Sequence, residues 1–103
     1  RRAARAVRVG DELKHYIVEL VQATRGRDGV QVGASPRASL ALLKTAQALA
    51  LFDGHEFVTP DHIQEVAIEV IAHRLVLEPE ARYSGLTEVQ VAREVLADVR
   101  APS

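Results

Sequence analysis

Residues 33–39 (GASPRAS) constrain the fold most strongly, because they predict where a helix begins. Ser35 has the side chain of a helix N-cap, whose hydroxyl can accept a hydrogen bond from a free backbone N–H of the first turn. Pro36 follows at the first helical position, where its missing N–H costs nothing. Arg37 then places a cation at the positive end of the helix dipole, which is unfavourable by up to about 1 kcal/mol. This placement indicates that Arg37 serves an anion outside the helix.

A second helix start has the same form with the opposite charge. Thr59 and Pro60 repeat the cap-and-proline arrangement, but Asp61 occupies the position that Arg37 holds in the earlier helix. An acidic residue is what the helix dipole favours there. The planar guanidinium of Arg37 could donate two hydrogen bonds to a phosphate beside the free N–H groups of the helix start. The alternative, a surface arginine paired with a carboxylate, is equally compatible with the sequence.

Composition limits the chain to one small domain. Its 103 residues are 48% hydrophobic but include only two Phe and two Tyr, so Ala, Val and Leu must form most of the core. The absence of cysteine excludes disulfides and thiolate metal sites. The net charge of −1 disfavours a dedicated nucleic-acid binder. The sequence has no apolar run that could span a bilayer and no secretory signal, and its lack of methionine predicts a piece of a longer protein.

Apolar residues at helical spacing predict four helices. They cover residues 11–25, 36–52 and 60–73 and a last segment that follows Thr87, which forms a capping box with Gln90. The predicted fold class is all-α: a small four-helix bundle, with room for a very short extended pair. An extended piece is expected at residues 30–32, a short extended link at residues 57–58 and an irregular crossing segment over residues 76–86. Residues 1–8, with four arginines, are interpreted as the tail of a connecting helix, which leaves residues 9–103 as the domain.

The sequence contains no complete catalytic motif. It lacks a phosphate-binding glycine loop, a nucleophile elbow and an HExxH pattern. The four histidines are too scattered for a metal site, because only His62 and His73 can share a helix face and they lie three turns apart. Arg74 and Lys44 are weaker candidates for anion binding than Arg37, since a helix-terminal and a surface cation explain them more simply.

Several motifs resemble the lid of the MoxR family of AAA+ ATPases. Residues 33–38 resemble the second sensor motif of that family, and the likeness extends over residues 9–86. It is also carried by residues 16–17, 23–25, 40–54, 57–61, 72–75 and 79–85. Two positions depart from the family pattern: His55 stands where an arginine is usual, and His62 stands where a second acidic residue is usual. The departures put in doubt local surface contacts and a salt bridge at the start of the third helix.

The resemblance implies that the chain is the C-terminal helical lid of an ATPase whose upstream core binds ATP and Mg²⁺. The lid closes over the nucleotide and Arg37 reaches the γ-phosphate as the catalytic residue, with Ser35 and Pro36 beside it at the nucleotide. Tyr16 and Ile17 are weaker candidates for lining the adenine, since a core role explains them more simply. No metal ligand is expected within this chain.

The resemblance also implies the partners. Members of the family assemble as rings, commonly hexamers, and are described as chaperone-like. The expected partners are the chain's own ATPase core, neighbouring subunits and a protein with a von Willebrand factor A domain, and the expected location is the cytoplasm. Whether Arg37 acts on its own subunit's nucleotide or on its neighbour's stays open.

A second hypothesis is a helical protein-interaction or DNA-binding domain without a nucleotide role. Residues 53–59 could form the turn of a helix-turn-helix reader. The following helix argues against it, because Asp61, Glu65 and Glu69 would place negative charge against the DNA phosphates.

Overall fold

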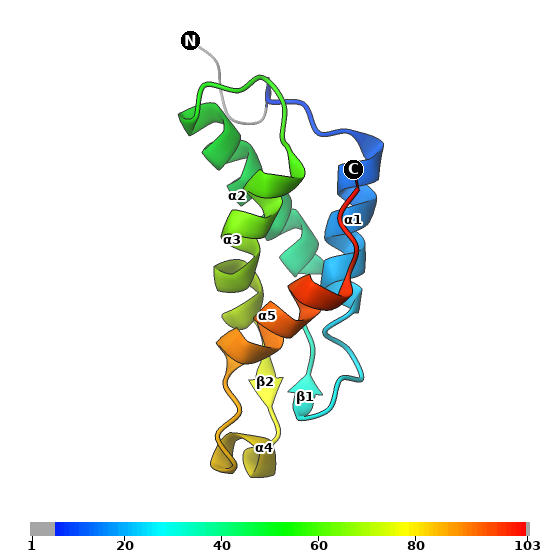
Figure 1. Cartoon of the computed structure of the whole chain (residues 1–103), viewed down its shortest axis with the longest axis vertical. Coiled ribbons are helices and arrows are strands. Elements are labelled where there is room, and N and C mark those ends of the chain that lie inside the picture. The colour runs from blue at the N-terminus through cyan, green and yellow to red at the C-terminus, as the bar shows by residue number, and fades with distance from the viewer. Residues whose placement is uncertain (1–5, 103) are drawn as a thin grey trace.

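The computed structural model describes residues 6–102, which form five helices and a two-stranded sheet (Figure 1). The elements in chain order are α1 (Asp11–Gln22), β1 (Val30–Val32), α2 (Pro36–Phe52), α3 (Pro60–Ala72), β2 (Val76–Leu77), α4 (Pro79–Tyr83) and α5 (Glu88–Asp98). The molecule is elongated, with extents of 49 × 24 × 19 Å. The prediction of an all-α domain with a very short extended pair is confirmed.

Helix α2 lies at the centre of the packing. It contacts both α1 and α3, and α5 crosses α3 near the lower end of the bundle in Figure 1. One side of α2 is buried at every fourth residue: Ala38, Leu42, Ala46 and Ala50. Because three of these four are alanine, the neighbouring helix axes can approach closely. The opposite side of α2 is exposed, so the helix is not covered around its whole circumference.

Three helix starts that the sequence predicted are observed, with one difference in their bonds. The threonine hydroxyls at Thr59 and Thr87 accept backbone N–H groups, and both helices have a capping box. Ser35 is the N-cap of α2, but its side chain makes no capping hydrogen bond. The predicted hydroxyl cap at Ser35 is therefore wrong, and the Ser35 carbonyl instead accepts the N–H of Ala38 at 2.8 Å.

The crossing segment is more regular than predicted. β2 pairs antiparallel with β1, with Val30 opposite Leu77, so the expected extended piece at residues 30–32 has a partner. Pro79 then occupies the first turn of the short helix α4, where proline is tolerated. The expectation of an irregular segment over residues 76–86 is wrong there. Helix α1 ends at Gln22 and not at residue 25, and residues 23–26 form a turn.

Gly29 fits the loop after α1 closely against the α4 region. Its φ of +84° is a backbone conformation that side-chain-bearing residues rarely adopt. A Cβ there would lie 2.6 Å from Cδ2 of Leu86 and 3.1 Å from Cβ of Ala81. The Glu78 N–H donates to the Gly29 carbonyl at 2.8 Å. The glycine thus allows the loop and the α4 region to touch.

The predicted helix tail over residues 1–8 lies mostly outside the described part of the chain, which begins at residue 6. Arg8 is not helical: its N–H donates to the Glu56 carbonyl at 3.0 Å, and its carbonyl accepts the Val58 N–H at 2.8 Å. It forms a parallel bridge with Phe57, which confirms the predicted extended link at residues 57–58. Among the described residues, none of the helices combines the length and apolar character that a membrane crossing requires.

Candidate functional site

Arg37 lies in the first turn of α2, and its side chain is exposed. Within residues 6–102, the guanidinium has no carboxylate at ion-pair distance and makes no hydrogen bond. The paired surface arginine, one of the two sequence interpretations, therefore has no support in this part of the chain. The cation is free to meet an anion from outside.

The start of α2 around Arg37 has no acidic side chain and no side-chain cap. The first turn of α2 contains no acidic residue, and the Ser35 side chain accepts none of its N–H groups. A helix leaves its first N–H groups without capping partners unless a side chain or a tighter turn supplies them. Pro36 has no N–H and the Ala38 N–H donates to the Ser35 carbonyl, so in the first turn of α2 the backbone N–H of Arg37 is the one without an acceptor among the described residues. Ser35 and Pro36 are exposed beside Arg37. A free backbone N–H next to a guanidinium suits a phosphate group.

A buried threonine fixes this helix start to the end of α1. Thr24 is fully buried, and its Oγ1 donates to the Val21 carbonyl at 2.7 Å. The same oxygen accepts the backbone N–H of Ala34 at 2.8 Å. Ala34 and Ala38, on either side of the exposed Ser35 to Arg37 segment, are also fully buried. These contacts hold the backbone that carries Arg37 in one position relative to α1.

Gly33 is required by the same contact. A Cβ at this position would lie 2.9 Å from Thr24 Oγ1 and 3.1 Å from Arg25 Cα. Any larger residue would therefore push the chain away from α1. Sequence reasoning missed the positioning roles of Thr24 and Gly33. The only available signal was that Thr24 continues the apolar stripe of the first helix, which predicts burial but not its partner ten residues later.

A shallow hollow adjoins the helix start. It is lined by the chain from Gln31 to Pro36 and by Arg25 and Gly26 in the turn that follows α1. Arg25 is exposed, so a second cation borders this surface. Among the described residues there is no group of three or more His, Cys, Asp or Glu side chains that could hold a metal ion. The donors here suit a phosphate and not Mg²⁺, which prefers oxygen ligands.

Tyr16 and Ile17 lie in the core of the domain and not beside Arg37. They are 1% and 2% exposed, and the Tyr16 hydroxyl accepts a hydrogen bond from Gln64 Nε2 at 3.3 Å. They precede Thr24 by two turns of helix, which is about 12 Å along the axis of α1. The structure therefore does not bring them together with Arg37, and their contact with adenine stays a prediction.

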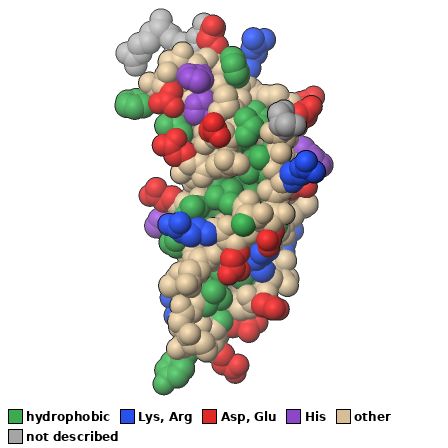
Figure 2. All heavy atoms as spheres, in the orientation of Figure 1, with side chains coloured by type: hydrophobic (Ala, Val, Ile, Leu, Met, Phe, Trp, Pro, Cys, Tyr) green, Lys and Arg blue, Asp and Glu red, His purple; other side chains and the backbone are tan. Residues whose placement is uncertain are grey.

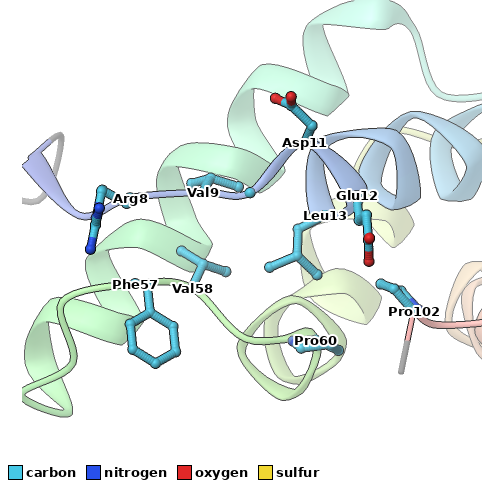
Figure 3. A pocket seen from close by; sticks show the side chains of 10 residues that line it. Arg8, Val9, Asp11, Glu12, Leu13, Phe57, Val58, Pro60 and Pro102 are labelled. Carbon is cyan, nitrogen blue, oxygen red and sulfur yellow. The ribbon is translucent and has the colours of Figure 1, made fainter.

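A more apolar hollow lies at the opposite end of α2 (Figure 3). Val9 and Leu13 face Phe57, Val58 and Pro60 across it, and Asp11 and Glu12 stand at its edge. None of the predicted site residues lines this hollow. The two ends of a 17-residue helix are about 24 Å apart, so it is separate from the Arg37 site.

The structure brings together two histidines that the sequence did not pair. The ring centroids of His55 and His62 are 4.9 Å apart, whereas His62 was expected to share a face only with His73. His62 is buried; its Nδ1 accepts the Thr59 N–H at 3.0 Å, and its Nε2 lies 3.5 Å from Asp53 Oδ2. Because Nδ1 is an acceptor, the neutral ring carries its proton on Nε2, directed toward Asp53. A metal-binding histidine uses one ring nitrogen for the metal and donates a hydrogen bond from the other. Both ring nitrogens of His62 already have protein partners, Thr59 and Asp53, so these contacts stabilise the start of α3 and leave no nitrogen for a metal.

Comparison with known proteins places the fold in a family. A family model of the AAA lid domain matches residues 22–95, and the chain belongs to this family. A crystal structure from Cytophaga hutchinsonii, provisionally named an ATPase, has a TM-score of 0.90 and 33% sequence identity over 97% of this chain and 33% of its own. The two chains are therefore alike in both fold and sequence.

The relatives of known sequence indicate which branch of the AAA lid family the chain resembles. The chain is 37% identical over 99 residues to Chaperone MoxR1 of Mycobacterium tuberculosis, a match covering 87% of this chain and 26% of that protein. It is 45% identical over 101 residues to Uncharacterized protein YeaC of Bacillus subtilis, covering 98% of this chain and 32% of that protein. The chain thus spans about a third or less of the length of these relatives. The predicted resemblance to a MoxR lid is confirmed.

Proposed function

We propose that this chain is the lid of a MoxR-type AAA+ ATPase and that Arg37 is its sensor for the γ-phosphate of ATP. The observation that carries the proposal is the exposed Arg37 in an uncapped helix start of an AAA lid domain. A guanidinium there stabilises the charge that accumulates on the phosphate oxygens during phosphoryl transfer. Ser35 and Pro36 lie beside it and shape the contact.

ATP, when bound by the upstream core, supplies the phosphoryl group that is transferred to water, and the Mg²⁺ ligands belong to that core. The role of this chain is to place Arg37 and to move with it. Because Thr24 and Gly33 fix the helix start to α1, and α1 belongs to one continuous core, the domain moves as a unit. Loss of the γ-phosphate after hydrolysis removes the contact with Arg37 and releases the lid.

The name of the tuberculosis relative supports a chaperone role for the whole protein. We propose that the lid works with its own ATPase core in a ring of subunits, acting on client proteins in the cytoplasm together with a von Willebrand factor A domain protein. Turnover requires both parts, so the chain alone should hydrolyse no ATP.

A DNA-binding function has less support from the structure. Asp61, Glu65 and Glu69 are exposed on α3, and none has an ion pair within the described residues. Their charge would face the phosphates if α3 entered a groove. Binding to a DNA duplex at low salt would favour this second hypothesis.

The experiment is the steady-state ATP turnover of the full-length protein that contains this lid. Arg37→Ala should lower kcat by roughly 10²–10³-fold, the loss expected when one group that stabilises transition-state charge is removed. Arg93→Ala on α5 is the matched control, because Arg93 is also exposed and also lacks an ion pair among the described residues. Equal turnover in the two variants would contradict the proposal.

A further inference from the structure

Residues 7–9 lead into α1, and we name them the entry segment. Val7 is 1% exposed, and Val9 packs against the core. Arg8 bonds through both its N–H and its carbonyl to the loop that follows α2, and Figure 3 shows Arg8 alongside Phe57 of that loop. A segment with a buried side chain and backbone hydrogen bonds on both sides of one residue is part of the folded domain and not a loose linker.

The loop that follows α2 is attached in turn to both neighbouring helices. The His55 N–H donates to the Ala50 carbonyl of α2 at 2.8 Å, and the ring centroid of His55 lies 4.9 Å from that of His62 on α3. Figure 2 shows histidine and apolar side chains gathered at the upper end of the molecule, where this loop lies in Figure 1. The loop therefore ties the entry segment to α2 and α3.

Gln47 joins the entry segment directly to α2. Its Nε2 donates to the Val7 carbonyl at 2.9 Å, and the side chain is half-buried. Gln47 follows Arg37 by ten residues, which is about 15 Å along the helix axis. Between them α2 has no proline and no glycine, the residues at which helices most often bend. An uninterrupted helix thus connects Arg37 with the entry segment.

The helix that carries Arg37 therefore has two anchors. At its start, the Thr24 hydroxyl accepts the Ala34 N–H and fixes the helix to α1. Toward its other end, Gln47 fixes the helix to the entry segment. In the proposed function the upstream core holds ATP, and the entry segment is the part of the chain that leads from that core into the lid. The orientation of Arg37 toward the nucleotide therefore depends on the second anchor.

We propose that Gln47 is a positioning residue for the reaction: its bond to Val7 aligns α2 with the entry segment and so aligns Arg37 with the γ-phosphate. The inference rests on the proposed function of Arg37, because Gln47 acts only through it. Gln47 is not a catalytic residue, since about 15 Å of helix separates it from Arg37. The entry segment moves with the lid, because its hydrogen bonds and its buried side chain are made with the lid.

The experiment is ATP turnover of the full-length protein in a double-mutant cycle of Gln47 and Arg37. Gln47→Met keeps the length of the side chain and removes its donor. The kcat should fall by about tenfold and the KM should change by less than about twofold, because misplacing a group costs rate even when the change is far from the chemistry. In the Arg37→Ala background Gln47→Met should lower kcat no further, because the effects of residues that act through one another do not add.

A second variant and a matched control make each outcome informative. Gln47→Glu also lacks the donor at the same length and should lose at least as much kcat, so the test does not depend on the folding of one variant. Thr45→Val removes a side-chain donor on the same helix, but one that bonds to the Ala41 carbonyl within α2. Its kcat should stay within about twofold of wild type.

Turnover by the folded Gln47 variants that equals that of Thr45→Val would overturn the inference. So would an equal fold-loss of kcat in the wild-type and Arg37→Ala backgrounds. In both cases a low kcat in Arg37→Ala would leave the proposed function standing. Unchanged turnover in Arg37→Ala would instead contradict the proposed function, and this inference with it.

Hydrogen exchange of the full-length protein tests the entry segment without reference to Arg37. The amides of Arg8 and Val58 should be protected both with a non-hydrolysable ATP analogue and with ADP, because their hydrogen bonds lie within the unit that moves. Unprotected exchange of either amide in one of the two states would overturn the claim that the entry segment moves with the lid.

Discussion

Thr24→Val tests the contact that fixes the start of α2. Valine has nearly the same shape as threonine but no hydroxyl, so the change removes the hydrogen bonds and keeps the packing. The Ala34 N–H, which donates to Thr24 Oγ1 at 2.8 Å, would be left in the core without an acceptor. The Val21 carbonyl loses less, because it still accepts the Thr24 N–H at 3.2 Å. An unsatisfied buried N–H costs about 1–3 kcal/mol, so we expect a loss of about 2 kcal/mol.

Urea unfolding followed by far-UV circular dichroism measures this loss. With a denaturant dependence of about 1–2 kcal/mol per molar urea, the midpoint should fall by about 1–2 M. Thr45→Val is the matched control: the Thr45 hydroxyl donates to the Ala41 carbonyl at 2.7 Å, but on the exposed side of α2. That variant should change stability by no more than about 0.5 kcal/mol. Equal midpoints for the two variants would refute the positioning role of Thr24.

Three further predictions concern other contacts. His62→Gln should keep the capping bond to Thr59 and a donor toward Asp53. His62→Glu buries a second carboxylate near Asp53, so its free energy of unfolding at pH 7 should be lower than that of His62→Gln by about 1–2 kcal/mol. Thermal unfolding of the two variants measures this difference. Gly29→Ala should lower the free energy of unfolding by about 1–2 kcal/mol, because of the positive φ and the contact with Leu86, and unchanged urea unfolding would contradict this. The side-chain hydrogen bond from Arg82, followed by a backbone hydrogen bond, lowers the pKa of Glu88. The stability that this pair contributes is therefore present above the unfolded pKa of glutamate, about 4.3, and is lost as the pH falls through the lowered value. Arg82→Gln should accordingly differ from wild type in urea unfolding at pH 7 and converge with it at pH 2.

Sequence reasoning worked where the determinants are local. Proline at a first helical position and a preceding Ser or Thr place the starts of α2 and α3 at the observed residues. The Thr87 and Gln90 pair, three residues apart, gave the start of α5 in the same way. These signals lie within one turn of helix, so no tertiary contact is needed to interpret them.

The sequence did not predict contacts between residues that lie far apart in the chain. The bond between Thr24 and Ala34 depends on the path of an intervening loop, and the Ser35 side chain makes no cap although its residue type favours one. Arg27, in the loop after α1, forms an ion pair with Asp98 on α5, 71 residues away. Spacing along one element carries no information about such partners.

The role of Arg37 is the part of the site that the sequence indicated best. Its unfavourable position at a helix N-terminus pointed to an external anion, and its exposure and lack of a partner within residues 6–102 agree with that interpretation. The anion itself could not be derived from this chain, because the proposed nucleotide-binding part belongs to the upstream core.

The most direct test of the account is the difference between ATP and ADP in binding to the full-length protein. Because Arg37 is proposed to contact only the γ-phosphate, Arg37→Ala should weaken binding of a non-hydrolysable ATP analogue by about tenfold or more, as loss of a charge-assisted hydrogen bond of about 1.5–3 kcal/mol predicts. Binding of ADP should stay the same. Isothermal titration calorimetry of both nucleotides against wild type, Arg37→Ala and Arg93→Ala measures this. Unchanged analogue binding in Arg37→Ala, or an equal loss for both nucleotides, would contradict the proposed γ-phosphate contact.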